Sequence, residues 1–190
     1  MEKNSISLVL DKKNVLIGKK NYDITLIISY YKIIPEKFLL HSKHNLVVHE
    51  SNLPKGRGFS PLIKQILNGK TKIVITLFEC SKNMDEGKFL LKKFFYFKPT
   101  LIYDEIKEKQ LKSAFFLLDL FLKKYKIKKN IKTYNQTGQP TFYKKIKSSF
   151  SELNINKTIK SQFNKLRTRN NENFPSYFIY KKRKYIIKIN

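Results

Sequence analysis

The chain has 190 residues, 41% of them hydrophobic, so it is long enough for one domain of ordinary size around a core, plus a small appendage. Its single cysteine, Cys80, excludes an internal disulfide, and His41, His44 and His49 lack the partner spacing of a zinc site, so no structural metal is expected. The net charge of +26 suits anionic ligands. Nearly all of the basic residues are lysines, however, in a chain that is also rich in Asn, Ile, Phe and Tyr, and this pattern is compatible with biased codon usage. The charge is therefore only a weak indication of nucleic-acid binding.

Two apolar stretches are too short to serve as targeting or membrane segments. Residues 6–10 are followed at once by an aspartate and two lysines, which is unlike a secretory signal. Residues 114–122 are interrupted by Asp119 and fall well short of the ~20 residues that a spanning helix requires. We therefore expect a cytoplasmic protein with no membrane partner.

Short β-rich runs alternate with loops and one compact helix between residues 22 and 97. This alternation predicts an α/β fold with a mostly parallel sheet. The helix after Ser60 has its apolar residues on one face and ends at Asn68 and Gly69, a common carboxyl-terminal cap. The expected strands are Ile24–Ser29, Leu46–Val48, Lys72–Phe78 and Phe89–Phe97, and the apolar face of the helix is Leu62, Ile63, Ile66 and Leu67.

The second half of the chain predicts a long helix and a small separate unit. Asp104 is expected to cap a helix that runs to about Lys124. Its expected buried side is Ile106, Leu111, Ala114, Phe115, Leu118, Phe121 and Leu122. After it, we expect a linker or exposed crossover at 126–140, separating a domain at 1–125 from a subdomain at 141–190. That subdomain should hold a helix with Ile155, Ile159, Phe163 and Leu166 on one face, and a hairpin over 177–189 that turns around Lys181, Lys182 and Arg183.

Residues 44–61 are the stretch in which a site is expected. An apolar strand at 46–48 runs into His49, then into an irregular loop that contains Pro54, Gly56 and Gly58, and then into the next helix. In open α/β sheets, ligands collect outside the carboxyl ends of strands, and a histidine there can act as an acid or base near neutral pH.

This stretch resembles the formyltransferase family, whose members move a formyl group from 10-formyltetrahydrofolate to an amine. The matching residues are His49, Ser51, Leu53, Pro54, Arg57, Gly58 and Pro61, and the loop at 84–87 supplies an aspartate, Asp85, 36 positions after His49. The resemblance covers most of residues 21–190. It implies a Rossmann-like formyltransferase sheet with a small C-terminal helix and hairpin.

The resemblance also implies roles for residues of this loop. His49 would polarise the formyl oxygen, and Asp85 would hold the histidine or a water that carries the proton. Ser51, Leu53 and Pro54 would lie at the folate donor, with Leu53 and Pro54 beside the pterin. Lys55 and Arg57 would border the acceptor, although Arg57 is equally well placed to pin the loop internally.

The chain departs from the family pattern at two places. The family's catalytic asparagine lies two residues before the histidine, and here that position is Val47, which offers no hydrogen bond to a developing oxyanion. Asn45 shares the face of His49 but lies about 13 Å away along a strand, so Asn52 is the better substitute candidate. Before residue 22, only 6–10 and 15–17 are available as strands, so about one βα unit of the family is expected to be missing.

The leading functional expectation is a formyltransferase that acts on the amino group of a nucleotide-linked sugar, because a diphosphate acceptor suits a basic protein. Methionyl-tRNA formylation is the alternative within the family, but about 50 residues after Pro140 are too few for the usual β-barrel of those enzymes. A further alternative is an inactive relative that binds nucleotides or RNA. The sequence indicates neither the oligomeric state nor the acceptor amine.

Overall fold

The central feature is a five-stranded sheet with the strand order β1-β2-β3-β5-β6. The computed structural model describes residues 6–10, for which the backbone alone is considered, 22–28, 30, 34–128 and 131–190. Val15–Ile17 and Ser29, which belong to the predicted strands, lie outside the described residues. The strands are β1 (Ile6–Leu10), β2 (Tyr22–Ile28), β3 (Ser42–His49), β5 (Lys72–Glu79) and β6 (Phe89–Tyr96).

The predicted mostly parallel sheet is wrong, because the sheet is mixed. Strands β1, β2 and β3 run parallel, whereas β5 pairs antiparallel with both β3 and β6. For β5 and β6, the reason lies in the connection at 80–88, which is shorter than the dozen or more residues that a parallel crossover needs. β5 and β6 therefore form a hairpin, and the sheet changes from parallel to antiparallel pairing at β3.

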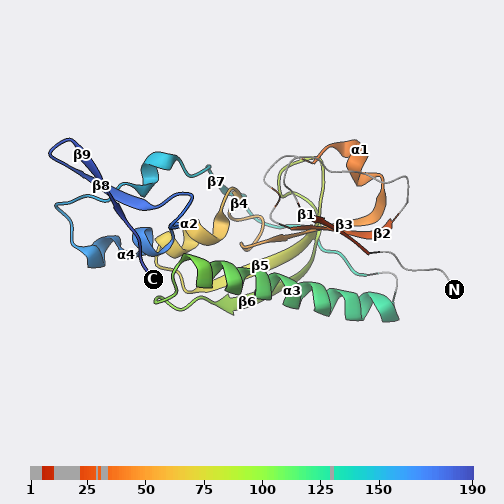
Figure 1. Cartoon of the computed structure of the whole chain (residues 1–190). Coiled ribbons are helices and arrows are strands. Elements are labelled where there is room, and N and C mark those ends of the chain that lie inside the picture. The colour runs from red at the N-terminus through yellow and green to blue at the C-terminus, as the bar shows by residue number, and fades with distance from the viewer. Residues whose placement is uncertain (1–5, 11–21, 29, 31–33, 129–130) are drawn as a thin grey trace.

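One face of the sheet is covered by the long helix α3 (Tyr103–Ile127), which runs along it in green in Figure 1. Its start is held by Glu105, whose carboxylate accepts a hydrogen bond from the backbone N–H of Ile102 at 2.9 Å. The helix contributes Leu118 and Phe121 to one apolar core cluster and Ile106 and Leu117 to another. The first cluster also holds Ile24, Leu26, Leu46, Leu77 and Leu90, and the second holds Leu62, Ile66, Ile73, Ile75 and Phe97.

The predicted buried side of this helix is correct only in part. Leu111 and Phe115, which were expected in the core, are 46% and 48% exposed, and Ser113 and Leu117 are buried in their place. Residues 114–118 are an uninterrupted apolar run, so the sequence does not show which of them faces the sheet.

Helix α2 (Pro61–Leu67) agrees well with its prediction. Leu62 and Ile66 are buried, and Gly69, at φ +76°, donates its N–H to the carbonyl of Ile66 at 2.9 Å. The short helix α1 (Glu36–Leu39) lies between β2 and β3 and buries Phe38. No helix in the described ranges has the length and apolarity to cross a membrane.

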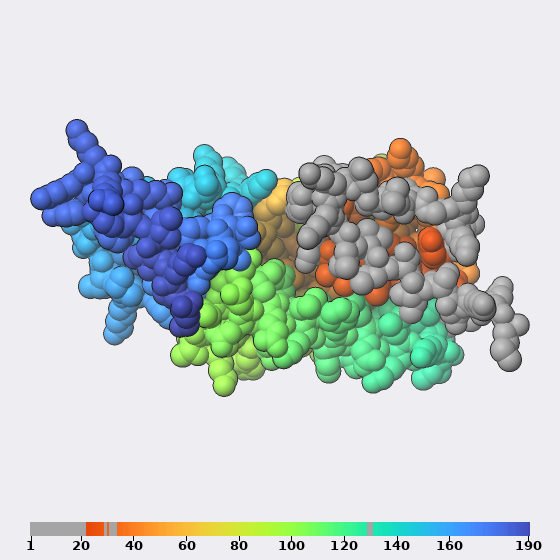
Figure 2. Space-filling model, in the orientation of Figure 1, coloured from red at the N-terminus to blue at the C-terminus, as the bar shows by residue number. Residues whose placement is uncertain are grey.

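The C-terminal part lies at one end of the molecule, drawn in blue in Figures 1 and 2. It consists of the 3-10 turn η1 (Ser148–Ser151), α4 (Ile159–Arg167) and a hairpin of β8 (Ser176–Tyr180) and β9 (Arg183–Ile187). The predicted hairpin is thereby confirmed, and Lys181 and Lys182 form its turn with φ values of +46° and +63°.

The predicted apolar face of α4 is only partly correct. Leu166 is buried, but Ile155 precedes the helix and is 49% exposed, and Ile159 is 57% exposed. The helix instead begins at Thr158, whose hydroxyl accepts the N–H of Ser161 at 3.2 Å.

Candidate active site

The two faces of β3 differ in chemistry. Leu46 belongs to the apolar cluster under α3, and Val48 packs against that cluster. Alternate residues point to the other face, where Val47 is paired with Phe78 and His49 with Thr76 of β5. The buried polar residues of this second face are Thr25, Asn45, His49 and Thr76. The carboxyl end of β3 therefore carries polar chemistry on the face opposite α3.

His49 is fixed at that end of the strand. It is 6% exposed, its ring lies edge-on to Phe78 with centroids 6.3 Å apart, and its Nε2 is 2.8 Å from the carbonyl oxygen of Gly56. A carbonyl can only accept, so this contact assigns the proton of a neutral ring to Nε2. The same Nε2 lies 3.8 Å from Oδ2 of Asp85, and the structure therefore brings together the two side chains that the sequence singled out.

Asp85 is held in position by backbone contacts on the loop between β5 and β6. Its Oδ2 accepts the N–H of Gly58 at 2.8 Å, and its φ of +53° is a left-handed conformation that aspartate tolerates better than most residues. The same loop packs so closely at Gly87 that only glycine fits there, because a Cβ would lie 1.6 Å from the carbonyl oxygen of Glu79. The carboxylate thus approaches His49 from a tightly packed loop.

The segment that follows α3 forms a wall of the site. Strand β7 (Phe142–Tyr143) pairs with the two-residue strand β4 (Arg57–Gly58) in the loop after His49. Thr141 accepts the N–H of Gly56 through its hydroxyl at 2.8 Å and the N–H of Arg57 through its carbonyl at 2.9 Å. The first residues of the segment expected to be a C-terminal subdomain at 141–190 therefore contact the site loop.

The side chain of Gln136 makes three hydrogen bonds in this wall, and the sequence analysis did not select it. Its amide nitrogen donates to the carbonyls of Asp85 and Gly87, each at 2.8 Å, and its amide oxygen accepts from Arg57 at 2.8 Å. No motif or periodicity marks this glutamine, because its partners lie about 50 and 80 residues away in the chain. It holds the aspartate loop against the histidine loop.

Arg57 pins the loop internally, which was one of its two predicted roles. It is 7% exposed, and its guanidinium binds Glu86 at 2.7 Å and Gln136 at 2.8 Å. Its Nε is buried without a hydrogen-bond partner among the described residues, and its predicted contact with an acceptor stays a prediction. Lys55 is exposed on the same loop, and its contact with an acceptor stays a prediction.

The residues expected at the folate donor lie next to His49. Ser51 is 2% exposed, and its hydroxyl has no hydrogen-bond partner among the described residues. Leu53 and Pro54 are buried by the protein itself, so in this conformation their side chains offer little surface to a pterin. Their contact with a donor stays a prediction, whereas Ser51 offers a buried polar group with unused capacity.

The candidate substitutes for the family's asparagine do not reach His49. Asn52 is exposed, and its side-chain oxygen accepts from the amine of Lys92 at 2.9 Å. Asn45 is buried and donates to the carbonyl of Leu39 at 2.8 Å. No described hydrogen bond joins either amide to His49, so the catalytic role predicted for Asn52 is without structural support.

The remaining titratable groups nearby have structural partners. His44 bonds Glu79 at 2.6 Å on the α3 face, between Phe121 and Tyr125. Burial, and then the charges of Asp85 and Glu79, raise the pKa of the Cys80 thiol to about 11. Across the described residues, no three His, Cys, Asp or Glu side chains gather as metal ligands would.

Comparison with known proteins decides the family. Residues 6–115, more than half of the chain, match the family model described as Formyl transferase. The chain belongs to the formyl transferase family. The matched range contains His49, Asp85 and the loop between β3 and α2, whereas Gln136 and Thr141 lie beyond it.

Similar proteins include enzymes of two kinds. The methionyl-tRNA formyltransferase of Thermotoga neapolitana is 31% identical over 105 residues, which are 55% of this chain and 34% of that protein. The chain thus spans about a third of the length of this curated relative. A solved methionyl-tRNA formyltransferase from Clostridium thermocellum has a TM-score of 0.70 at 20% identity, covering 86% of this chain and 70% of the other. A 4-N formyltransferase from Francisella tularensis has a TM-score of 0.67 at 16% identity, covering 88% and 70%. These structures share the α/β fold of this formyl transferase family member.

Proposed function

We propose that this protein transfers a formyl group from 10-formyltetrahydrofolate to an amine, with His49 and Asp85 as its catalytic residues. The observation that carries the proposal is the 3.8 Å approach of Asp85 Oδ2 to His49 Nε2 at the carboxyl end of β3. Membership of the formyl transferase family supports the reaction type. The two side chains come from separate loops, and each is held by a backbone group of the 56–58 loop.

The two side chains supply what formyl transfer requires of the protein. The donor brings the formyl carbon and leaves as tetrahydrofolate when the amine has taken it. In this structure the Nε2–H of His49 donates to the carbonyl of Gly56, and by exchanging that acceptor for the formyl oxygen it would stabilise the negative charge that develops there. The carboxylate of Asp85 accepts the proton that the amine loses, directly or through a water.

One residue of this loop, Ser51, offers a hydrogen-bonding group to the folate donor. The hydroxyl of Ser51 is buried without a partner, and a buried polar group without a hydrogen bond costs free energy. A folate has ring nitrogens and amide groups that can satisfy it. Ser51 would therefore hold the donor near His49, and Leu53 and Pro54 would border it.

For the acceptor, we propose the amino group of a nucleotide-linked sugar. Sugar N-formyltransferases are among the proteins that share the fold, and one of them was solved with a nucleotide-linked amino sugar. A net charge of +26 attracts the diphosphate of such an acceptor. The second candidate, methionyl-tRNA, is favoured by the curated relatives, several of which carry that name.

The test compares both acceptors with the same protein. Purified full chain is incubated with 10-formyltetrahydrofolate and either a nucleotide-linked amino sugar or methionyl-tRNA, and the release of tetrahydrofolate is followed. We expect release with the amino sugar and a loss of roughly 10³-fold in His49→Ala. Equal rates in His49→Ala and the parent would disprove the assigned site, and formylation of the tRNA alone would establish the second candidate.

A further inference from the structure

A cluster of positive charges surrounds one aromatic ring where α2 meets the C-terminal part. The ring of Phe150, in η1, has the Nζ of Lys165 at 4.9 Å, the guanidinium carbon of Arg169 at 5.1 Å and the Nζ of Lys64 at 6.0 Å from its centroid. A ring has two faces, so at least two of these three cations lie on the same side or near its edge. We call Lys64, Phe150, Lys165 and Arg169 the Phe150 cluster.

Arg169 is the member whose surroundings are unusual. It is 9% exposed, its Nε is buried without a hydrogen bond, and no described residue accepts a hydrogen bond from its guanidinium. Burial accordingly lowers its pKa. The charge of Tyr103 acts against this shift in pKa. A buried N–H without an acceptor is costly, and proteins usually pair a guanidinium with a carboxylate or a phosphate.

Arg167, two residues earlier at the end of α4, is also buried, but its guanidinium has hydrogen-bond partners. It is 1% exposed, yet its guanidinium donates to the carbonyls of Lys98 and Leu101 and to the side chain of Asn164. The loop between β6 and α3, together with Asn164, thus supplies acceptors for Arg167, whereas no described residue does so for Arg169.

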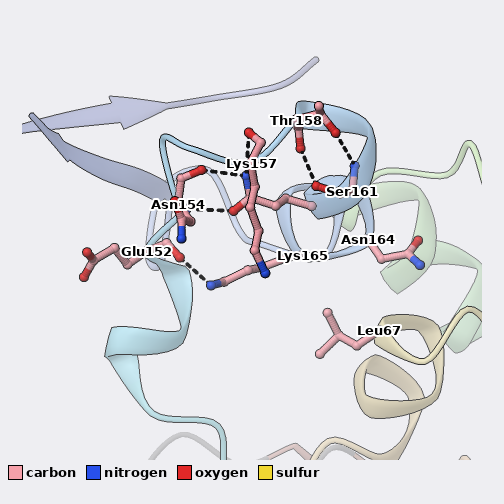
Figure 3. A pocket seen from close by; sticks show the side chains of 9 residues that line it. Leu67, Glu152, Asn154, Lys157, Thr158, Ser161, Asn164 and Lys165 are labelled. Atoms are coloured by element: carbon pink, nitrogen blue, oxygen red, sulfur yellow. Dashed lines mark hydrogen bonds between the residues drawn. The ribbon is translucent and has the colours of Figure 1, made fainter.

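A hollow opens beside the cluster. It has a volume of about 620 Å³ and lies between the end of α2, the turn at 152–158 and α4. Lys157 and Lys165 both line it, above Leu67 (Figure 3). Burial lowers the pKa of Lys165, the charge of Glu152 opposes this, and the charges of Arg169 and Lys157 lower the pKa further by smaller amounts.

From this geometry we propose that the Phe150 cluster and the adjoining hollow bind a phosphoryl group of a small molecule. Arg169, Lys165 and Lys64 would share the anion, and Lys157 would close the open side. Glu152 is the one carboxylate that lines the hollow, and the backbone carbonyl of the same residue already holds the amine of Lys165. This site is separate from His49 and Asp85, and the proposal does not depend on the reaction proposed for them.

The test is an isothermal titration of the full chain with sodium pyrophosphate at low salt. Arg169→Gln and Lys165→Gln should weaken binding by about tenfold or more, because each removes a charged donor to the anion. Lys160→Gln is the matched control, since it removes one exposed charge from the same helix outside the hollow, and it should change the affinity by less than about twofold. A nucleoside diphosphate titrated in parallel shows whether a nucleotide or free phosphate is preferred, and Arg169-dependent binding of either one supports the site.

Two results would overturn the proposal. One is pyrophosphate binding that weakens equally in Lys160→Gln and Arg169→Gln, which would show attraction to a diffusely basic surface. The other is no measurable binding by the parent. If circular dichroism shows that Arg169→Gln is unfolded, the comparison of Lys165→Gln with Lys160→Gln decides, because Lys165 is partly exposed and tolerates replacement.

Discussion

The two faces of β3 and β5 carry different kinds of residue on the same backbone. On the α3 side, Leu46 and Leu77 pack into a cluster with Leu118 and Phe121. On the other side, buried polar residues such as His49 and Thr76 bond to the loop that follows β3. One face packs into the core and the other carries the proposed active site, so stability and activity can be tested separately.

The largest expected effect is on the polar face, from Asp85→Asn. Asparagine also tolerates the left-handed backbone and can still accept the N–H of Gly58, so the change removes little more than the charge. We expect formyl transfer to fall by about 10²- to 10³-fold with little loss of stability. Steady-state kinetics and thermal unfolding measure the two quantities, and a variant with parental kcat would remove Asp85 from the reaction.

On the apolar face, Leu118→Ala should cost about 3 kcal/mol of unfolding free energy, because Leu118 is 3% exposed. Leu111→Ala on the same helix is the control, and because that side chain is 46% exposed it should cost about 0.5 kcal/mol or less. Urea unfolding of both variants gives the difference. Equal losses would mean that α3 presents another side to the sheet.

Gln136→Leu should affect the polar face indirectly. It removes the hydrogen bonds that hold the carbonyls of Asp85 and Gly87, and we expect kcat to fall about tenfold while KM changes little. Gln139→Leu, at an exposed position of the same segment, should behave as the parent. A loss of stability with an unchanged pH profile and unchanged kcat would reduce Gln136 to a structural residue.

The last prediction concerns thiol reactivity and not catalysis, at Cys80, whose pKa is raised from 9.0 to about 11. Iodoacetamide should label it roughly 100-fold more slowly at neutral pH than an ordinary thiol, since two pKa units separate them. The folded state holds this proton more tightly than the unfolded state, so the stabilisation is complete below pH 9.0 and is lost as the pH rises to about 11. Asp85→Asn should speed the labelling, and ordinary reactivity in the parent would contradict the raised pKa of Cys80.

Local sequence patterns predicted most helices and strands and the position of His49. They could not predict the direction in which strands pair or the contacts between residues far apart in the chain. The strand at 46–48, the cap at Gly69 and the hairpin turn at 181–182 depend on residues close in sequence, and they appear where expected. The antiparallel course of β5 depends on the path of its connections, which periodicity does not encode. Similarly, the internal role of Arg57 depends on Glu86 and Gln136, two partners far along the chain.

The pairing of β4 with β7 also determines where this protein could be recombined with another. A chimaera joined directly after α3 would lose Gln136 and Thr141, and it would leave the amide of Gly56 and the carbonyl of Asp85 without their present partners. A junction placed after Tyr143 keeps those contacts within the transplanted piece. The segment that should be exchanged as a unit therefore extends past the sheet and α3 to Tyr143, and a C-terminal part taken from another protein should begin after that residue.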